Sequence, residues 1–156
     1  MVTAVTMAAA AKAAGVTLLA DLNAAALQAS AAKLGAVELR RAEHVVGEID
    51  RVARMRVALR AGDLAAAGHL LSASHESSRT RFENSTEELD FLVTQLRAVS
   101  GVYGARLTGG GFGGAVMALT DERFDAAGAQ GVSAAYGARF GAEPEVLPMA
   151  TGDGAA

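Results

Sequence analysis

The sequence predicts an α+β domain: a helical first two-thirds followed by a short, incomplete antiparallel sheet. Apolar residues recur at helical spacing as far as residue 100. After Gly101 the pattern changes to short apolar runs on both sides of a glycine-rich loop, residues 109–114, which is typical of strand–loop–strand structure. The 156 residues suit one domain. We expect that domain to cover residues 1–150, with a flexible tail over 151–156.

The first hundred residues are rich in alanine and leucine, both of which favour helix formation. Helices are expected over residues 3–14, 21–34, 37–60, 64–81 and 85–100. Several boundaries have their own signals. Gly62 is suited to a C-terminal stop and Asp63 to an N-terminal cap, while Ser85 with Glu88 three residues later matches a capping box.

The helix over 37–60 has the clearest amphipathic pattern. We expect its apolar positions to be buried: Ala42, Val45, Val46, Ile49, Val52 and Ala53. Two oppositely charged pairs with a spacing of four residues, Asp50 with Arg54 and His44 with Glu48, are expected to meet on its surface.

The helix over 64–81 places His75 on one stripe with Gly68 and Leu71. We therefore interpret His75 as a buried, hydrogen-bonded histidine rather than a catalytic base.

The last third is expected to hold three strands and one helix. The strands are predicted over 105–108, 114–119 and Glu145–Pro148, and the helix over 121–140. Pro144 precedes the third strand, where its missing N–H does little harm.

Composition excludes several classes of function. A net charge of −3 gives no basic field for nucleic acid or an anionic membrane surface. The absence of cysteine excludes disulfides and thiol nucleophiles, and it fits a cytoplasmic protein. No stretch reaches the roughly 18 apolar residues of a membrane-spanning helix. The three histidines do not form a metal-binding pattern.

The glycine loop is the strongest chemical signal in the chain. Five of the six residues from Gly109 to Gly114 are glycine, and the sixth is Phe112. Successive backbone N–H groups in such a loop can form a concavity that binds phosphate. A dinucleotide fold would need a helix directly after the glycines, but residues 115–119 predict a strand. A tight strand–loop–strand connection without a ligand is the alternative.

Five segments together resemble the C-terminal domain of galactokinases, in the GHMP superfamily of small-molecule kinases. They are Arg41-Ala-Glu-His-Val-Val-Gly-Glu48, Leu59-Arg-Ala-Gly-Asp-Leu64, Ser74-His-Glu-Ser77 with Arg79, Glu88-Leu-Asp90 and Gly104-Ala-Arg-Leu-Thr-Gly-Gly-Gly-Phe-Gly-Gly114. The resemblance covers nearly the whole chain and implies a ferredoxin-like sandwich for the sheet region. The chain departs from the family's pattern at five positions. Glu43 replaces a common arginine, Thr80 and Arg81 an acidic pair, Asn84 an apolar residue and Ala115 a cysteine.

The resemblance implies an ATP-dependent sugar kinase that transfers the γ-phosphoryl group of Mg-ATP to the anomeric hydroxyl of galactose. The family's sugar-recognition segment, ATP loop and catalytic aspartate belong to an N-terminal half that is absent here. We therefore expect no catalytic residue and no metal ligand in this chain, and no turnover by it alone. The implied cofactor-binding residues are Thr108, Gly109, Gly110, Gly111, Phe112, Gly113 and Gly114.

The implied partners are the N-terminal kinase half, or a second copy of the chain, and a small sugar. The alternatives are a stand-alone, non-catalytic domain that binds a metabolite or a partner protein, and a kinase of the same superfamily with another substrate. The reversed charge at Arg81 bears on that last alternative. Within the loop region, Phe112 is expected to be a packing wedge, Tyr103 an anchor for the turn and Thr108 a hydrogen-bonding residue of the turn. Arg106 is expected to face either the cleft or solvent.

Overall fold

The fold is mostly helical with one small sheet, which confirms the predicted α+β class. A computed structural model describes residues 2–150 and 152. The elements are α1 (Val2–Ala13), α2 (Ala24–Ser30), α3 (Ala36–Arg60), α4 (Leu64–Ser77), α5 (Glu87–Arg97), β1 (Val102–Thr108), β2 (Ala115–Thr120) and α6 (Ala126–Phe140). Single turns of 3₁₀-helix cover Leu19–Asp21 and Ala31–Lys33, and a π-helical turn, η3, covers Ser78–Phe82.

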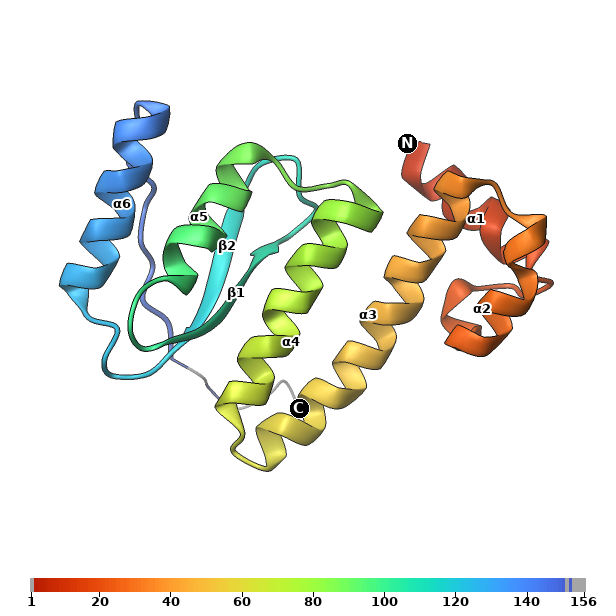
Figure 1. Cartoon of the computed structure of the whole chain (residues 1–156), viewed down its shortest axis with the longest axis horizontal. Coiled ribbons are helices and arrows are strands. Elements are labelled where there is room, and N and C mark those ends of the chain that lie inside the picture. The colour runs from red at the N-terminus through yellow and green to blue at the C-terminus, as the bar shows by residue number, and fades with distance from the viewer. Residues whose placement is uncertain (1, 151, 153–156) are drawn as a thin grey trace.

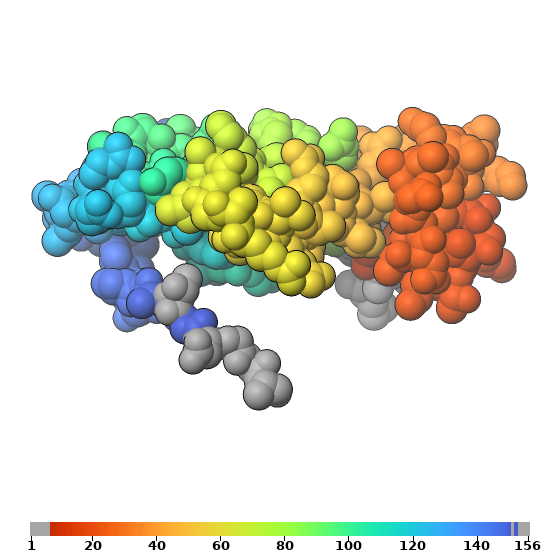
Figure 2. Space-filling model, turned by 90° about the horizontal axis from the view of Figure 1, so that it is seen from below, coloured from red at the N-terminus to blue at the C-terminus, as the bar shows by residue number. Residues whose placement is uncertain are grey.

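Helix α3 runs through the middle of an elongated molecule (Figures 1 and 2). Near its start it packs against α1 and α2, and toward its end it lies beside α4 (Figure 1). The first contact forms an aliphatic core of Ala10, Ala11, Leu19, Leu22, Leu27, Ala42 and Val46. None of the helices described here is both long enough and apolar enough to cross a membrane.

The middle of α3 is less buried than its pattern predicts. Ile49 is 41% exposed, Val52 is 61% exposed and Ala53 is exposed too, so the expectation that these three are buried is wrong. The two ends of α3 serve different neighbours: Val46 packs toward α1, and Ala58 packs toward α4. Ile49 and Val52 lie between these two contacts and line a shallow groove.

Helix boundaries follow local capping, and several differ from prediction. The helix expected over 21–34 is shortened to Ala24–Ser30 by the 3₁₀ turns on either side of it, and the helix expected to end at residue 100 ends at Arg97. Asp63 caps α4 by accepting from the N–H of Ala66 (2.9 Å), as expected. Helix α5 is capped by Thr86 instead of Ser85, because the Ser85 hydroxyl donates to Asp90 (2.6 Å). Helix α6 begins at Ala126, five residues later than predicted, where the Asp125 side chain accepts from Gly128 N–H. Helix α4 ends at Ser77 and continues as η3.

The sheet described here is the antiparallel pair β1–β2, with Ala105 opposite Ala118 and Leu107 opposite Val116. The predicted third strand over 145–148 is wrong, because this segment has no regular structure and Leu147 is 69% exposed. Pro148 within that segment lacks the N–H that a paired strand would donate. The predicted tail falls almost entirely outside the described residues.

Helix α4 lies in backbone contact with β1. A Cβ atom on Gly68 would overlap the carbonyl of Tyr103, and a Cβ atom on Gly104 would overlap the carbonyl of Gly68. Glycine at both positions is what allows the helix and the strand to approach so closely. This contact fixes β1, and therefore the start of the glycine loop, against α4.

Helix α6 attaches to the rest of the fold through α5. The rings of Phe91 on α5 and Phe140 on α6 meet edge to face, with centroids 5.5 Å apart, and Tyr136 lies 4.7 Å from Phe140. The guanidinium of Arg139 lies over both phenylalanine rings and also pairs with Glu87. The interface is aromatic on one side and charged at its margin.

Candidate functional site

The glycine loop is the tip of the β1–β2 hairpin, which confirms the predicted strand–loop–strand structure. β2 begins at Ala115, directly after the last glycine, so the helix that a dinucleotide fold requires is replaced by a strand. The backbone φ is positive at Gly109, Gly111, Gly113 and Gly114, and also at Phe112 (58°). The loop therefore follows a path that a chain of ordinary residues would adopt only with strain.

Most of the loop is open. Among the described residues, no atom lies within 4 Å of the position that a Cβ atom would take at Gly109, Gly110, Gly113 or Gly114. Phe112 is 69% exposed, so its expected role as a packing wedge is wrong. The main chain of the loop is thus accessible, and a phosphate group would have room beside it.

The loop is held at its centre by Asn84, which follows η3. The carbonyl of Asn84 accepts from the N–H of Phe112 (2.7 Å), and its Nδ2 donates to the carbonyl of Gly110 (3.1 Å). Gly111 lies directly on Asn84, where an added Cβ atom would overlap the carbonyl oxygen of Asn84. Asn84 itself is only 6% exposed.

The residue before Asn84 is fixed to helix α3. Glu83 adopts a left-handed conformation with φ of 59°. Its carboxylate pairs with Arg40 and with Arg41, each at 3.1 Å, and Arg41 also donates to the carbonyl of Phe82 (2.6 Å). These contacts tie the end of η3 to α3.

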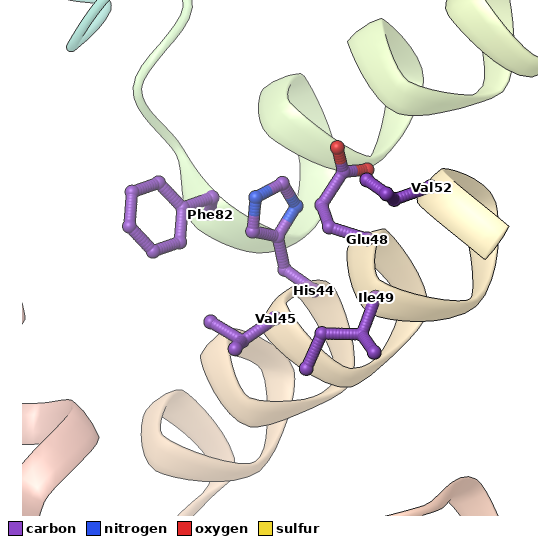
Figure 3. Close-up of a pocket in the computed structure, with 6 residues that line it drawn as sticks. All are labelled: His44, Val45, Glu48, Ile49, Val52 and Phe82. Atoms are coloured by element: carbon purple, nitrogen blue, oxygen red, sulfur yellow. The ribbon is translucent and has the colours of Figure 1, made fainter. Parts of the chain in front are cut away.

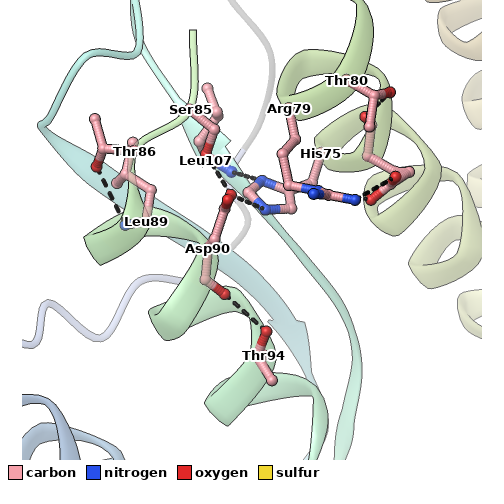
Figure 4. Close-up of polar contacts among 10 residues, drawn as sticks. His75, Arg79, Thr80, Ser85, Thr86, Leu89, Asp90, Thr94 and Leu107 are labelled. Carbon is pink, nitrogen blue, oxygen red and sulfur yellow. Dashed lines mark hydrogen bonds and ion pairs between the residues drawn. The ribbon is translucent and has the colours of Figure 1, made fainter. Parts of the chain in front are cut away.

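His75 links α4, α5 and β1 (Figure 4). The N–H of Leu107 donates to its Nδ1 (3.3 Å), and its Nε2 lies 3.1 Å from Asp90. This arrangement suits the neutral ring with its proton on Nε2. Burial lowers the pKa of His75, and the nearby charge of Asp90 opposes the shift only in part. The interpretation of His75 as a buried, hydrogen-bonded histidine is confirmed.

A second polar cluster lies between α3, α4 and β1. Glu48 accepts from Ser74 (2.7 Å) and Arg51 (2.5 Å), and Arg106 lies 3.5 Å from it. Burial raises the pKa of Glu48, but the hydrogen bonds from Ser74 and Arg51 outweigh it and leave the pKa lowered. Arg106 therefore points toward α3.

His44 faces α4 as well. Its Nδ1 lies 2.9 Å from the hydroxyl of Ser77, and its ring packs on Phe82 with centroids 4.6 Å apart (Figure 3). Burial lowers the pKa of His44. The expected surface pair of His44 with Glu48 is wrong, because each side chain bonds to helix α4 instead, whereas Asp50 and Arg54 do meet (3.6 Å).

Two departures from the family's pattern face each other. Arg81 Nε lies 3.4 Å from Glu43 Oε2, at the edge of a groove between α2 and α3. The reversed charge at Arg81 is therefore matched by a reversed charge at Glu43. The local net charge is balanced, so this reversal alone is no argument for a different substrate.

Residues 55–137 match the family model described as GHMP kinases C terminal, which is more than half of the chain. The chain belongs to this family. Human galactokinase is 55% identical over 82 residues, which cover 53% of this chain and 21% of that protein. Bovine galactokinase is 44% identical over 111 residues, or 71% of this chain and 28% of that protein.

The fold also matches a galactokinase of known structure. The crystal structure of Lactococcus lactis galactokinase complexed with galactose aligns with a TM-score of 0.85 and 31% identity, covering 90% of this chain and 38% of that one. This family member therefore has the fold of a galactokinase C-terminal domain. It spans less than a third of the length of the galactokinase sequences compared above.

Sequence reasoning missed the contact between Asn84 and the loop. Asn84 was singled out only as a departure from the family's pattern, and its partners lie 26 and 28 residues further along the chain. The clamp of Glu83 by Arg40 and Arg41 was also missed. A left-handed glutamate has no signal in the sequence, because non-glycine residues adopt that conformation only where tertiary contacts hold it.

Proposed function

We propose that this chain is the C-terminal domain of a galactokinase-like, ATP-dependent sugar kinase. The complete enzyme transfers the γ-phosphoryl group of ATP to O1 of galactose. The observation that carries this proposal is the open glycine loop at the tip of a hairpin, in a chain that shares the galactokinase C-terminal fold. In this proposal Thr108 to Gly114 form one wall of the cleft in which phosphate is transferred.

The loop suits an anionic, crowded ligand. Its open glycine positions leave space for phosphate oxygens, and backbone N–H groups would offset part of their charge. Phosphoryl transfer depends mainly on positioning and on neutralising charge. The described residues contain no group of three or more His, Asp or Glu side chains able to hold a metal ion. We assign the ligands of Mg²⁺ to the nucleotide phosphates, which such sites use together with one or two carboxylates, and to the other half of the enzyme.

The partner in this proposal is the N-terminal kinase half. Three features support a covering protein surface. The ring of Phe112 is exposed, Ile49 and Val52 expose apolar side chains, and β2 pairs only with β1 among the described residues. A second copy of this chain is the competing occupant. Light scattering over a wide concentration range distinguishes them, since a monomer that assembles only with the N-terminal half argues against the homodimer.

The test is reconstitution. The purified chain is mixed with the N-terminal half of a galactokinase, and ADP release is followed with ATP and galactose present. We expect turnover from the mixture and none from either half alone. Omitting galactose controls for ATP hydrolysis, and glucose in its place tests the sugar. Turnover by the chain alone would refute the assignment of catalysis to the other half. A complex that binds nucleotide without turnover would favour the non-catalytic binding domain.

A further inference from the structure

We propose that Asn84 is a positioning residue that fixes the shape of the glycine loop and ties the loop to helix α3. Its effect on nucleotide affinity rests on the proposed function, whereas its effect on the loop does not. Asn84 is not proposed as a catalytic residue, since it acts through the main chain of residues 110–112.

The loop meets Asn84 at three consecutive residues. Gly110 receives a hydrogen bond from the side chain, Phe112 donates to the main-chain carbonyl, and Gly111 between them lies against both groups. The remaining loop glycines have open space at their Cβ positions among the described residues. Asn84 is therefore an attachment point at the centre of the loop.

Asn84 is itself held firmly. It follows Glu83, whose strained left-handed backbone is kept in place by Arg40 and Arg41 of α3. The hydrogen bond from Arg41 to the carbonyl of Phe82 fixes the preceding residue as well. A continuous set of contacts thus runs from α3 through Glu83 and Asn84 to Gly110 and Phe112.

The amide group is specifically required at this position. Nδ2 faces a carbonyl and must be a donor, whereas Oδ1 is buried and has no hydrogen-bond partner among the described residues. Leucine would keep the branching of asparagine at Cγ, with two larger methyl groups, and lose the donor. Aspartate would place a carboxylate oxygen against the Gly110 carbonyl and leave a buried charge. We expect the aspartate variant to disturb the loop more than the leucine variant.

Holding the loop in one conformation reduces the conformational entropy that is lost when a nucleotide binds. Glycine-rich segments lose much conformational entropy when a ligand orders them. A loop already ordered by Asn84 avoids part of that loss, which appears as tighter binding of the triphosphate. Phe112, a non-glycine residue with positive φ, is the residue whose conformation depends most on this support.

The first experiment uses the chain alone. Amide hydrogen exchange is measured by NMR for the wild type, for Asn84→Leu and for the control Thr94→Val, which removes an exposed side-chain hydrogen bond on α5. In Asn84→Leu we expect the N–H of Phe112, which donates to the Asn84 carbonyl, to exchange about fivefold faster, the size of one net hydrogen bond. Amides of β1, β2 and α4 should be unchanged. Equal exchange in the variant and the wild type, or faster exchange throughout the chain, would overturn the proposal.

The second experiment uses the reconstituted kinase. Asn84→Leu should raise the KM for ATP about fivefold and leave kcat and the KM for galactose within twofold. Asn84→Asp should raise the KM for ATP further, and Thr94→Val should match the wild type. A variant with altered loop exchange and an unchanged KM for ATP would overturn the functional part. Failure of the wild-type reconstitution would count against the proposed function, while exchange on the chain alone still decides the role of Asn84.

Discussion

Glycine serves opposite purposes in two neighbouring regions of this molecule. Where α4 crosses β1, Gly68 and Gly104 are packed so tightly that neither has room for a Cβ atom. In the loop at the end of the same hairpin, Gly109, Gly110, Gly113 and Gly114 have open space there among the described residues. The first region uses glycine to bring two backbones together. The second uses it to follow an unusual path and to leave room for a ligand. Stability should therefore depend on the first region, and binding on the second.

The largest effect is expected at the backbone contact. Gly104→Val would force α4 and β1 apart, because the new side chain would overlap the main chain of Gly68. We expect a loss of about 3 kcal/mol or more in the free energy of unfolding, toward the upper range for overpacked sites. Urea unfolding followed by circular dichroism measures it. A loss below about 1 kcal/mol would show that the two elements separate easily.

The centre of the loop should behave as an intermediate case. Gly111→Val combines a positive φ of 78° with overlap of the Asn84 carbonyl, so we expect destabilisation by about 1–3 kcal/mol. Gly110→Ala is the matched control, since its Cβ position is open, and it should stay within about 0.5 kcal/mol of the wild type. The melting temperatures of the two variants provide the comparison. Equal values would contradict the conclusion that Gly111 is packed against Asn84.

The packed region should also respond to pH through His75. Its pKa is lowered in the folded state, so folding favours the neutral ring, and this contribution is fully present above the unfolded value of about 6.5. As the pH falls below 6.5, protonation would place a donor against the N–H of Leu107, and stability should decline. The charged groups that act on the ring are Asp90 on α5 and Glu76 and Arg79 near the end of α4.

Urea titrations between pH 7 and pH 5 measure this decline. His75→Gln should flatten the curve, leaving the part due to His44, whose pKa is also lowered. His69→Gln, at an exposed position of α4, is the control and should retain the wild-type slope. A slope unchanged in His75→Gln would assign the pH dependence to other groups.

The smallest effect is expected outside both regions, at the pair Glu43–Arg81. Half of the Arg81 side chain is exposed, so reversing either charge alone should cost about 0.2–1 kcal/mol. The double variant Glu43→Arg with Arg81→Glu should recover most of that loss, and a double-mutant cycle measures the coupling. No recovery would show that the two charges act independently.

The sequence predicted the parts of the fold that depend on local pattern. Gly62 follows the end of α3 and Asp63 caps the start of α4, as expected. The hairpin follows from two apolar runs around the glycines. The errors arise where distant contacts decide. Ser85 matched a capping pattern but bonds to Asp90, and His44 turned toward Ser77, 33 residues away.

In the candidate site, too, the features set by local sequence were predictable and those set by distant contacts were not. The positive φ angles of Gly111 and Gly113 were foreseeable, because glycine clusters indicate unusual backbone. The exposure of Phe112 and the anchoring by Asn84 were not, because both depend on how η3 is placed against the hairpin. The family resemblance identified the loop as important without indicating what holds it.

The attachment of α6 has a consequence for how the molecule comes apart. This last helix rests on α5 through Phe91, Tyr136 and Phe140, whereas the hairpin tip is held by Asn84, which is anchored to α3 through Glu83. The two sets share no residue, so α6 can open as a separate cooperative unit before the rest unfolds. Heating should then release Tyr136 from its neighbouring rings at a lower temperature than it melts the central helices. Helix α6 would then separate from α5 while the glycine loop keeps its structure.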